Sequence, residues 1–262
     1  MSSRSSLRST ARFSDRVENY VRYRPSYPTQ VLSILEQETG LEVDSAIADI
    51  GSGTGISAEL FLKNGNTVFG IEPNQPMRQA AEQQLARYTH SHKATFHSIN
   101  GTAEATTLPN HCVDYIVCAQ AFHWFNQAQA KQEFTRILRA NGWLVLMWNT
   151  RRIESTPFLK DYEALLLRYG TDYQQIRHRN ITTDELKLFF NSDIQIRTFD
   201  NQQHFDFEQL KGRLLSSSYT PKLGHPNFEP MLNELQKIFE QHQTNHKIHF
   251  EYDTELYFGR AS

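Results

Sequence analysis

Three glycines alternate with small residues in the stretch IADIGSGTG (residues 47–55). Gly51, Gly53 and Gly55 can adopt positive φ angles, and they let a ligand approach the backbone without meeting a Cβ atom. Asp49 stands just before them, and a helix that starts directly after them would add free backbone N–H groups. The stretch therefore predicts either a tight structural turn or a binding loop whose carboxylate suits a positively charged ligand.

Two further polar positions follow along the chain. Glu72 comes 21 positions after Gly51, at the end of the next apolar run. A carboxylate there can accept hydrogen bonds from ribose hydroxyl groups, because ligands of open parallel sheets bind at the carboxyl ends of strands. The polar stretch NGTAEA (100–105) follows the third run and can border an adenine ring. A loop, an acid and a polar turn in this order predict a site for an adenosine-bearing ligand.

Two classes of adenosine-bearing cofactor fit such a site. A dinucleotide motif reads Gly-x-Gly-x-x-Gly, with the pyrophosphate on the helix N-terminus, whereas position 56 of this chain is Ile. Asp49 would repel a pyrophosphate but suits a ligand that carries an ammonium and a sulfonium group. These features favour S-adenosylmethionine, and an NAD(P)-dependent oxidoreductase remains the less favoured alternative.

Short apolar runs that alternate with helical stretches are expected to position these residues. The runs suit strands buried on both faces of a parallel sheet, and they are 46–50, 67–72, 94–99, 113–120 and 143–150. The helical patterns between them are 56–65, 75–89 and 126–142. Strand and helix in alternation predict right-handed crossovers and an open sheet covered by helices.

Further elements flank this core. Helical patterns are 14–24, 29–40, 156–170, 182–192, 208–218 and 229–243, and strand patterns are 194–207 and 246–260. We expect residues 1–12 to form a flexible tail and 13–262 to form a single domain. Its parts would be N-terminal lid helices (13–40), a cofactor-binding core (41–150), a helical insertion (151–192) and C-terminal strands and helices (193–262).

Several segments together resemble the successive motifs of class I S-adenosylmethionine-dependent methyltransferases. They are ADIGSGTG, VFGIEPN, NGTAEATTLPNHCVDYIVCAQAFHWF and ILRANGWLVLMWNTR. The chain is most similar to the methyltransferase type 11 branch that includes trans-aconitate methyltransferase-like proteins, whose N-terminal signature resembles YVRYRPSYP (20–28). The resemblance implies a Rossmann-like α/β fold: a doubly wound, seven-stranded, mostly parallel sheet of order 3-2-1-4-5-7-6, with helices on both faces and one antiparallel strand at 246–260.

The resemblance also implies that residues at strand ends, with a few from neighbouring helices, hold the cofactor. The set is Asp49, Gly51, Ser52, Gly53, Gly55, Glu72, Pro73, Asn74, Met77, Thr102, Ala103, Glu104, Ala119, Gln120, Tyr20 and Arg24. Residues 49–53 would line the methionine part, Glu72 the ribose and 102–104 the adenine. Residues 119–120 would lie beneath the reacting sulfur.

The implied reaction moves a methyl group in line from S-adenosylmethionine to a small-molecule acceptor and leaves S-adenosylhomocysteine. Holding the acceptor in line supplies much of the catalysis. His123 is the candidate catalytic base for a hydroxyl or amine acceptor, and packing or a structural hydrogen bond is its alternative role. A carboxylate acceptor needs no base at neutral pH.

Arginines are best suited to hold an acidic acceptor, because guanidinium groups recognise carboxylates in pairs of hydrogen bonds. The candidates are Arg24, Arg151, Arg152, Arg177 and Arg179. Arg151, Trp124 and Tyr219 form the predicted acceptor-binding set. The polar run LLSSSYTP (214–221), which contains Tyr219, either lines the acceptor pocket or ends a helix.

The composition of the chain argues against nucleic-acid binding, metal binding and a membrane span. The net charge is −2 without a dense basic stripe, so we expect no nucleic-acid partner. The 2 cysteines cannot form a thiolate cage, and Thr244 and Asn245 should end the helix between His242 and His246, so we expect no metal. No apolar run approaches the roughly 18 residues of a membrane span. We expect a cytoplasmic monomer or homodimer, and a non-catalytic S-adenosylmethionine-binding protein remains an alternative.

Overall fold

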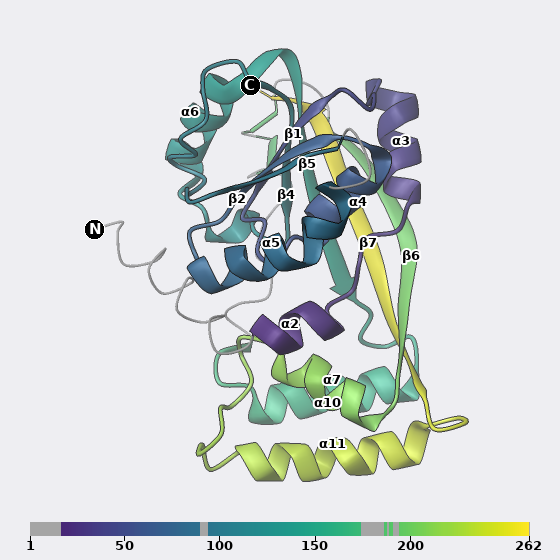
Figure 1. Ribbon diagram of the computed structural model, residues 1–262. Coiled ribbons are helices and arrows are strands. Elements are labelled where there is room, and N and C mark those ends of the chain that lie inside the picture. Colours follow the sequence, from purple (N-terminus) through teal and green to yellow (C-terminus); the bar gives the residue numbers. More distant parts are fainter. Residues whose placement is uncertain (1–16, 90–93, 174–185, 188, 191–193, 262) are drawn as a thin grey trace.

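A seven-stranded sheet of order β3-β2-β1-β4-β5-β7-β6 runs through the computed structural model (Figure 1). The model describes residues 17–89, 94–173, 186–187, 189–190 and 194–261. The strands are β1 (Ala46–Ile50), β2 (Thr67–Ile71), β3 (Phe96–Ile99), β4 (Val113–Ala119), β5 (Leu138–Arg151), β6 (Gln195–Phe205) and β7 (Ile248–Arg260). The pairs among β1 to β5 are parallel, and β7 is antiparallel to both β5 and β6. The predicted order and the single antiparallel strand are confirmed.

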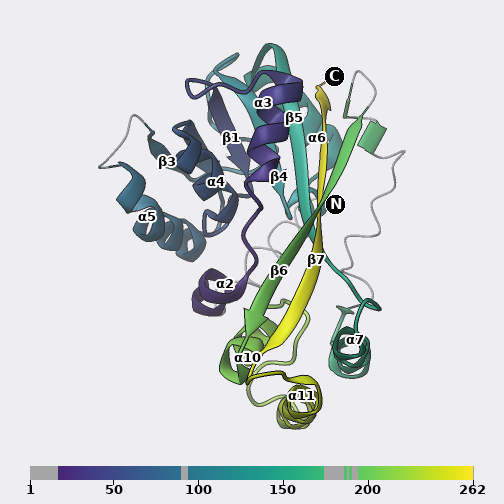
Figure 2. The same ribbon diagram turned by 90° about the vertical axis from the view of Figure 1, so that its right-hand side faces the viewer.

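Helices cover both faces of the sheet (Figure 2). They are α2 (Val17–Tyr23), α3 (Gln30–Thr39), α4 (Ile56–Asn64), α5 (Gln75–Thr89), the 3-10 turn η2 (Phe122–Trp124), α6 (Gln127–Ile137), α7 (Pro157–Tyr169), α10 (Phe207–Leu215) and α11 (Phe228–His242). Successive residues of β4 point to opposite faces. Tyr115 and Val117 pack in one core cluster with α3, α4 and α5, while Ile116 and Cys118 pack in a second cluster with α6.

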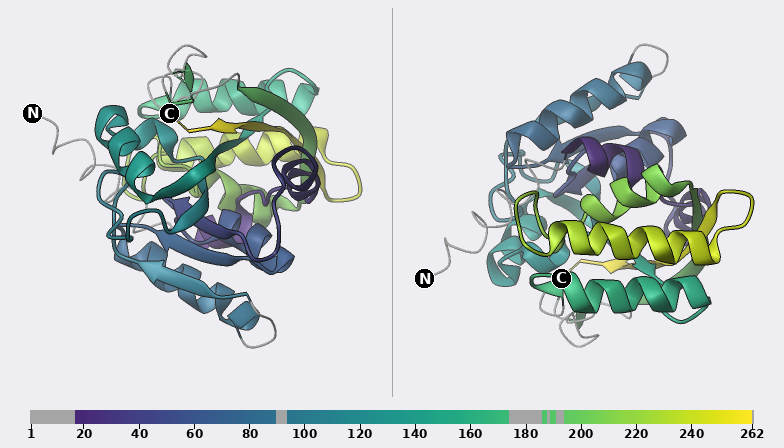
Figure 3. Two further views of the ribbon diagram at one scale, coloured as in Figure 1. Left: turned by 90° about the horizontal axis from the view of Figure 1, so that it is seen from above. Right: turned by 90° about the horizontal axis from the view of Figure 1, so that it is seen from below.

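A third core cluster lies beyond the carboxyl end of β5, where α7, α10 and α11 gather against the ends of β6 and β7 (Figure 1). We call these three helices the cap. Phe250 and Tyr252 of β7 are fully or almost fully buried in this cluster. Helices α7 and α11 lie side by side (Figure 3). The cap therefore covers the end of the sheet at which the ligand site is expected.

Most predicted elements agree with the structure, and the largest boundary error lies between α6 and β5. The helix predicted at 126–142 ends at Ile137, and β5 begins at Leu138 instead of residue 143. His111 N and Cys112 N donate hydrogen bonds to the carbonyls of Arg136 and Ile137, so the chain entering β4 satisfies the helix end before Asn141–Gly142 is reached. Strand β6 ends at Phe205 because Asp206 caps α10.

Some sequence predictions lie outside the described residues. These are the tail at 1–12 and most of the helix expected at 182–192. Within the described part of the chain, no helix combines the length and the apolar composition that a bilayer crossing requires.

Candidate functional site

The glycine turn joins β1 to α4, and its glycines serve different purposes. Gly51 has φ +70°, and a Cβ atom on it would lie 2.6 Å from Cβ of Ala121. Gly53 has φ +55°, and a Cβ atom on it would meet nothing within 4 Å. The N–H groups of Gly51 and Ser52 donate to the carbonyl of Ile71 at 2.8 and 3.2 Å. Packing therefore requires a glycine at position 51, whereas Gly53 faces open space.

Glu72 ties the glycine turn to the start of α5. Its Oε2 accepts a hydrogen bond from Gly53 N at 3.0 Å, and its Oε1 accepts one from Asn74 N at 2.8 Å. Burial raises the pKa of the Glu72 carboxyl above its usual range. Each carboxylate oxygen can accept further hydrogen bonds, so the contact with the turn leaves acceptor capacity for a ligand hydroxyl.

Asp49 is fully buried behind the turn. Its Oδ2 accepts a 2.7 Å hydrogen bond from Oγ of Ser57, and its Oδ1 is buried with no hydrogen-bond partner among the described residues. Burial, with a smaller contribution from the nearby charge of Glu72, raises the pKa of Asp49 to about 7. A buried carboxylate oxygen without a donor is unfavourable unless a ligand supplies one.

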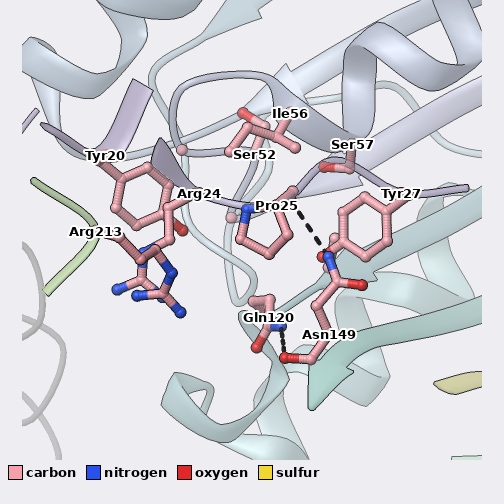
Figure 4. A pocket seen from close by; sticks show the side chains of 13 residues that line it. Tyr20, Arg24, Pro25, Tyr27, Ser52, Ile56, Ser57, Gln120, Asn149 and Arg213 are labelled. Atoms are coloured by element: carbon pink, nitrogen blue, oxygen red, sulfur yellow. Dashed lines mark hydrogen bonds between the residues drawn. The ribbon is translucent and has the colours of Figure 1, made fainter. Parts of the chain in front are cut away.

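A pocket opens between this turn and the N-terminal segment (Figure 4). Its volume is about 480 Å³ including the open mouth. The lining residues are Tyr20, Arg24, Pro25, Tyr27, Gly51, Ser52, Gly53, Ile56, Ser57, Ala119, Gln120, Asn149 and Arg213. Seven of these belong to the predicted cofactor set, from three separate parts of the chain. The fold therefore brings the N-terminal signature, the glycine turn and the end of β4 together.

The buried Arg213 and the half-buried Arg24 form one side of the pocket (Figure 4). Arg24 donates from Nη2 to the carbonyl of Ser216 at 3.0 Å and lies 4.8 Å from the ring centre of Tyr20. Arg213 donates to the hydroxyl of Tyr252 at 3.0 Å and to Oγ of Ser217 at 3.2 Å. Neither guanidinium has a carboxylate partner within the described part of the chain. Burial and the neighbouring charge of Arg213 lower the pKa of Arg24.

Amide side chains fix the backbone that carries Arg24. We call residues 17–27 the lid segment. Asn149 donates from Nδ2 to the carbonyls of Pro25 and Ser26, both at 3.3 Å, and Asn201 donates to Ser26 O at 2.8 Å. Gln120, beside Asn149, has φ +59° and donates from Nε2 to Asn149 O at 3.1 Å (Figure 4). A non-glycine residue held in this conformation marks a position that the surroundings strongly determine.

Six lining residues are absent from the predicted site, namely Pro25, Tyr27, Ile56, Ser57, Asn149 and Arg213. Asn149 stands near the carboxyl end of β5, so the strand-end rule that selected Gln120 would also have selected it. Tyr27 lies within the N-terminal signature. Arg213 carries no such signal, because it lies on an ordinary amphipathic helix of the cap.

The predicted ribose and adenine residues lie outside this pocket lining. Glu104 accepts a hydrogen bond from Asn126 N at 2.8 Å, and Asn74 accepts one from Met77 N at 3.1 Å. Met77 and Ala103 are buried, Pro73 is exposed, and Thr102 pairs with Ala105 in a short bridge. Gly55 caps α4, and a Cβ on it would meet Leu85 at 2.6 Å. Binding roles for these residues stay predictions.

The predicted catalytic and acceptor residues also lie off the pocket lining. The rings of His123 and Trp124 in η2 contact each other at a tilt of 45°, with ring centres 4.7 Å apart. Arg151 forms an ion pair with Glu163 and donates to the hydroxyl of Tyr173 at 2.9 Å. The Tyr219 ring packs on Tyr173, with centres 4.8 Å apart. Glu163 and Tyr173 engage Nη2 of Arg151, whereas its Nη1 is buried without a hydrogen-bond partner among the described residues.

The other arginines predicted to hold an acidic acceptor are not placed in the pocket by the structure. Arg152 pairs with Asp253 at 2.6 Å and with Asp200, whereas Arg177 and Arg179 lie outside the described residues. Nε2 of His242, at the end of α11, donates to Oδ2 of Asp161 at 2.6 Å. Arg24 and Arg213 are therefore the arginines best placed to meet an acidic ligand in the pocket.

The chain is similar in sequence to known methyltransferases. Residues 48–146 match the family model of a methyltransferase domain. A methyltransferase of Mycobacterium tuberculosis is 33% identical over 167 residues, which are 64% of this chain and 62% of that protein. The chain spans about three fifths of the length of the curated relatives that it matches.

Solved structures share the fold over most of the chain. A protein described as a type II methyltransferase from Anaeromyxobacter dehalogenans has a TM-score of 0.65 and 17% identity, and covers 91% of this chain and 98% of its own. Phosphoethanolamine N-methyltransferase 2 of Haemonchus contortus, solved with S-adenosyl-L-methionine, has a TM-score of 0.52 and 13% identity, over 96% of this chain and 56% of its own. At these identities the likeness concerns the fold alone.

Proposed function

We propose that the chain is a class I S-adenosylmethionine-dependent methyltransferase that transfers a methyl group from S-adenosylmethionine to a small-molecule acceptor that carries a carboxylate. The family supports the cofactor, through the methyltransferase domain at residues 48–146 and the sheet order. The acceptor class is supported by one observation. Arg213, which is buried, and Arg24, which is half-buried, line the pocket beside the glycine turn, and neither has a carboxylate partner among the described residues.

The residues of the turn fit S-adenosylmethionine. The unpartnered Oδ1 of Asp49 suits the positively charged methionine part, and the open space at Gly53 leaves room for the cofactor beside the backbone. Glu72 keeps acceptor capacity for the ribose, and residues 102–104 are the predicted border of the adenine. When bound, this cofactor supplies a methyl group activated by its sulfonium.

Arg24 and Arg213 fit a carboxylate acceptor. Burying a cation without an anion costs free energy, because the cation loses its hydration. Two guanidinium groups on one wall add their charges and raise this cost. A carboxylate that accepts hydrogen bonds from them would offset it, and such charge-assisted contacts also fix orientation. The pocket therefore favours an anionic acceptor over a neutral or cationic one.

A carboxylate acceptor also agrees with the pocket lining, which includes no histidine among the described residues. His123, the predicted base, lies off this lining. A carboxylate is ionised at neutral pH and needs no proton removed. One of its oxygens forms the new bond to the methyl carbon as the carbon–sulfur bond breaks. The products are a methyl ester and the neutral thioether S-adenosylhomocysteine, so one positive and one negative charge disappear together.

The test is a metabolite-library screen that follows S-adenosylhomocysteine release by the full chain. We expect turnover with carboxylates and none with the corresponding methyl esters. Arg24→Met and Arg213→Met should each raise the acceptor KM by at least about tenfold, since each removes a charge-assisted contact. Arg168→Met, at an exposed pair with Glu234, is the control and should not change KM.

Other outcomes would overturn the proposal. Turnover of amines or alcohols with the same KM in both arginine variants would refute the carboxylate acceptor. If the protein binds S-adenosylhomocysteine but no acceptor leads to its formation from S-adenosylmethionine, the protein would be a non-catalytic binding protein.

A further inference from the structure

A chain of three hydrogen bonds leads from Arg213 to the backbone of the lid segment. Arg213 Nε donates to the hydroxyl of Tyr252 at 3.0 Å, and this hydroxyl donates to Oε1 of Gln203 at 3.0 Å. Gln203 Nε2 then donates to the carbonyl of Tyr23 at 3.3 Å. Every donor in the chain points in the same direction. Bonds aligned in this way polarise and strengthen one another.

The surroundings keep this chain dry at its centre. Arg213 is 6% exposed and Tyr252 is 1% exposed, so water does not compete for their hydrogen bond. The guanidinium of Arg213 also lies over the rings of Phe250 and Tyr252, at 5.4 and 5.8 Å from their centres. These contacts from β7 hold Arg213 in one orientation. Arg213 thus lines the pocket while the Nε–H of its guanidinium is bonded to Tyr252 of the sheet.

The lid segment depends on such tethers, because its helix is poorly anchored by apolar packing. Helix α2 has no buried residue. The ring of Tyr23 lies directly on α10, where a Cβ atom at Gly212 would overlap it. Tyr27, at the end of the segment, is buried in the first core cluster. The anchors between α2 and Tyr27 include the polar contacts from Asn149 and Asn201 to the carbonyls of residues 25–26. A lid held by a few hydrogen bonds opens locally at low free-energy cost.

We propose that Tyr252 and Gln203 are positioning residues that couple Arg213 to the lid segment. The group that would receive the acceptor's carboxylate then also holds in place the segment that carries Arg24 and Tyr20 over the pocket. Acceptor binding at Arg213 and closure of the lid segment over the site favour each other. The identity of the anion rests on the proposed function, whereas the link between Arg213 and the lid segment does not.

Hydrogen exchange of the full chain, followed by mass spectrometry, tests the link without any ligand. Tyr252→Phe removes one oxygen and makes no change to a hydrogen bond of the lid segment itself. We expect peptide 17–27 to exchange about fivefold faster in this variant, the effect of losing one typical hydrogen bond. Gln203→Met should have an effect of similar size. The double variant should exchange no faster than either single variant, because both cut the same chain.

A matched control separates the link from general loosening. Tyr115→Phe removes another hydroxyl of a buried tyrosine, which lies 2.9 Å from Oγ1 of Thr39 and far from the lid segment. Exchange of peptide 17–27 should be unchanged in this variant. Wild-type exchange in Tyr252→Phe, additive effects in the double variant, or equal acceleration of a β1 peptide would each refute the proposal.

Cofactor affinity gives a second readout. S-adenosylhomocysteine should bind severalfold more weakly to Tyr252→Phe and Gln203→Met, because part of the binding energy must then order the lid segment. Unchanged affinity in both variants would contradict the coupling to the site. Failure of the wild-type protein to bind S-adenosylhomocysteine would instead refute the proposed function, and the exchange experiment would still decide on the link.

Discussion

Oγ of Ser57 donates a 2.7 Å hydrogen bond to Oδ2 of Asp49, and Oδ1 of the same carboxylate is buried without a partner among the described residues. The arrangement disfavours the ionised carboxylate, and burial raises its pKa to about 7. A side chain whose ionised form reduces the stability of the fold is typical of a binding site. The cation of S-adenosylmethionine would supply the missing interaction.

Asp49→Asn should therefore stabilise the protein and lower its affinity for the cofactor. The folded-state pKa lies above the unfolded value, so the folded protein holds a proton that the unfolded chain has released, and stability falls as pH rises from about 4 to about 7. At pH 8 the Asn variant should be more stable by about 2–4 kcal/mol. Urea unfolding at pH 5 and pH 8 checks this, and the advantage should shrink at pH 5, where the wild-type carboxyl is protonated.

Cofactor affinity should depend on pH through the same group. The ammonium group of the ligand pairs with ionised Asp49, so S-adenosylhomocysteine should bind more weakly as pH falls below about 7. The slope should approach tenfold per pH unit, and calorimetric titrations between pH 5.5 and 8.5 measure it. In Asp49→Asn the affinity should be lower and nearly flat over this range. A wild-type affinity that stays constant down to pH 5.5 would contradict the assignment.

The glycines of the turn allow a matched pair of substitutions. Gly51→Ala places a Cβ 2.6 Å from Ala121, whereas Gly53→Ala places one in open space. Both pay about 1–2 kcal/mol for a left-handed backbone, and Gly51→Ala adds the cost of the clash. Thermal unfolding should therefore show the larger loss for Gly51→Ala. Gly53→Ala should fold but bind S-adenosylhomocysteine at least about tenfold more weakly, because the new methyl occupies ligand space; wild-type affinity there would refute its role.

The sequence predicts well those helices and strands whose ends depend on nearby residues. Strand β1 and helix α4 match their predicted residues closely, because a continuous apolar run and the glycine turn define both ends. The start of β5 was missed, since it depends on pairing between Val113 and Leu138 rather than on a local stop signal. Arg213 was missed for the same physical reason. Its place beside Arg24 arises only when α10 packs on α2, and no residue spacing in the sequence encodes that contact.

Arg151 and Glu163 should behave as a structural pair. Their side chains are 10% and 11% exposed, so Glu163→Gln leaves a buried guanidinium without its anion. We expect a loss of about 3 kcal/mol in the free energy of unfolding. Glu234→Gln breaks the more exposed pair with Arg168 and should cost less than about 1 kcal/mol. Denaturant titration compares the two, and equal small losses would show that the Arg151 pair is not structural.

Calorimetric titration of the wild-type chain with S-adenosylmethionine, S-adenosylhomocysteine and NAD tests the central claim most directly. The account predicts that the first two bind at the glycine turn and that NAD does not, because Asp49 repels a pyrophosphate and Ile56 stands where a dinucleotide motif has glycine. Binding of NAD, with neither sulfur compound bound, would contradict it.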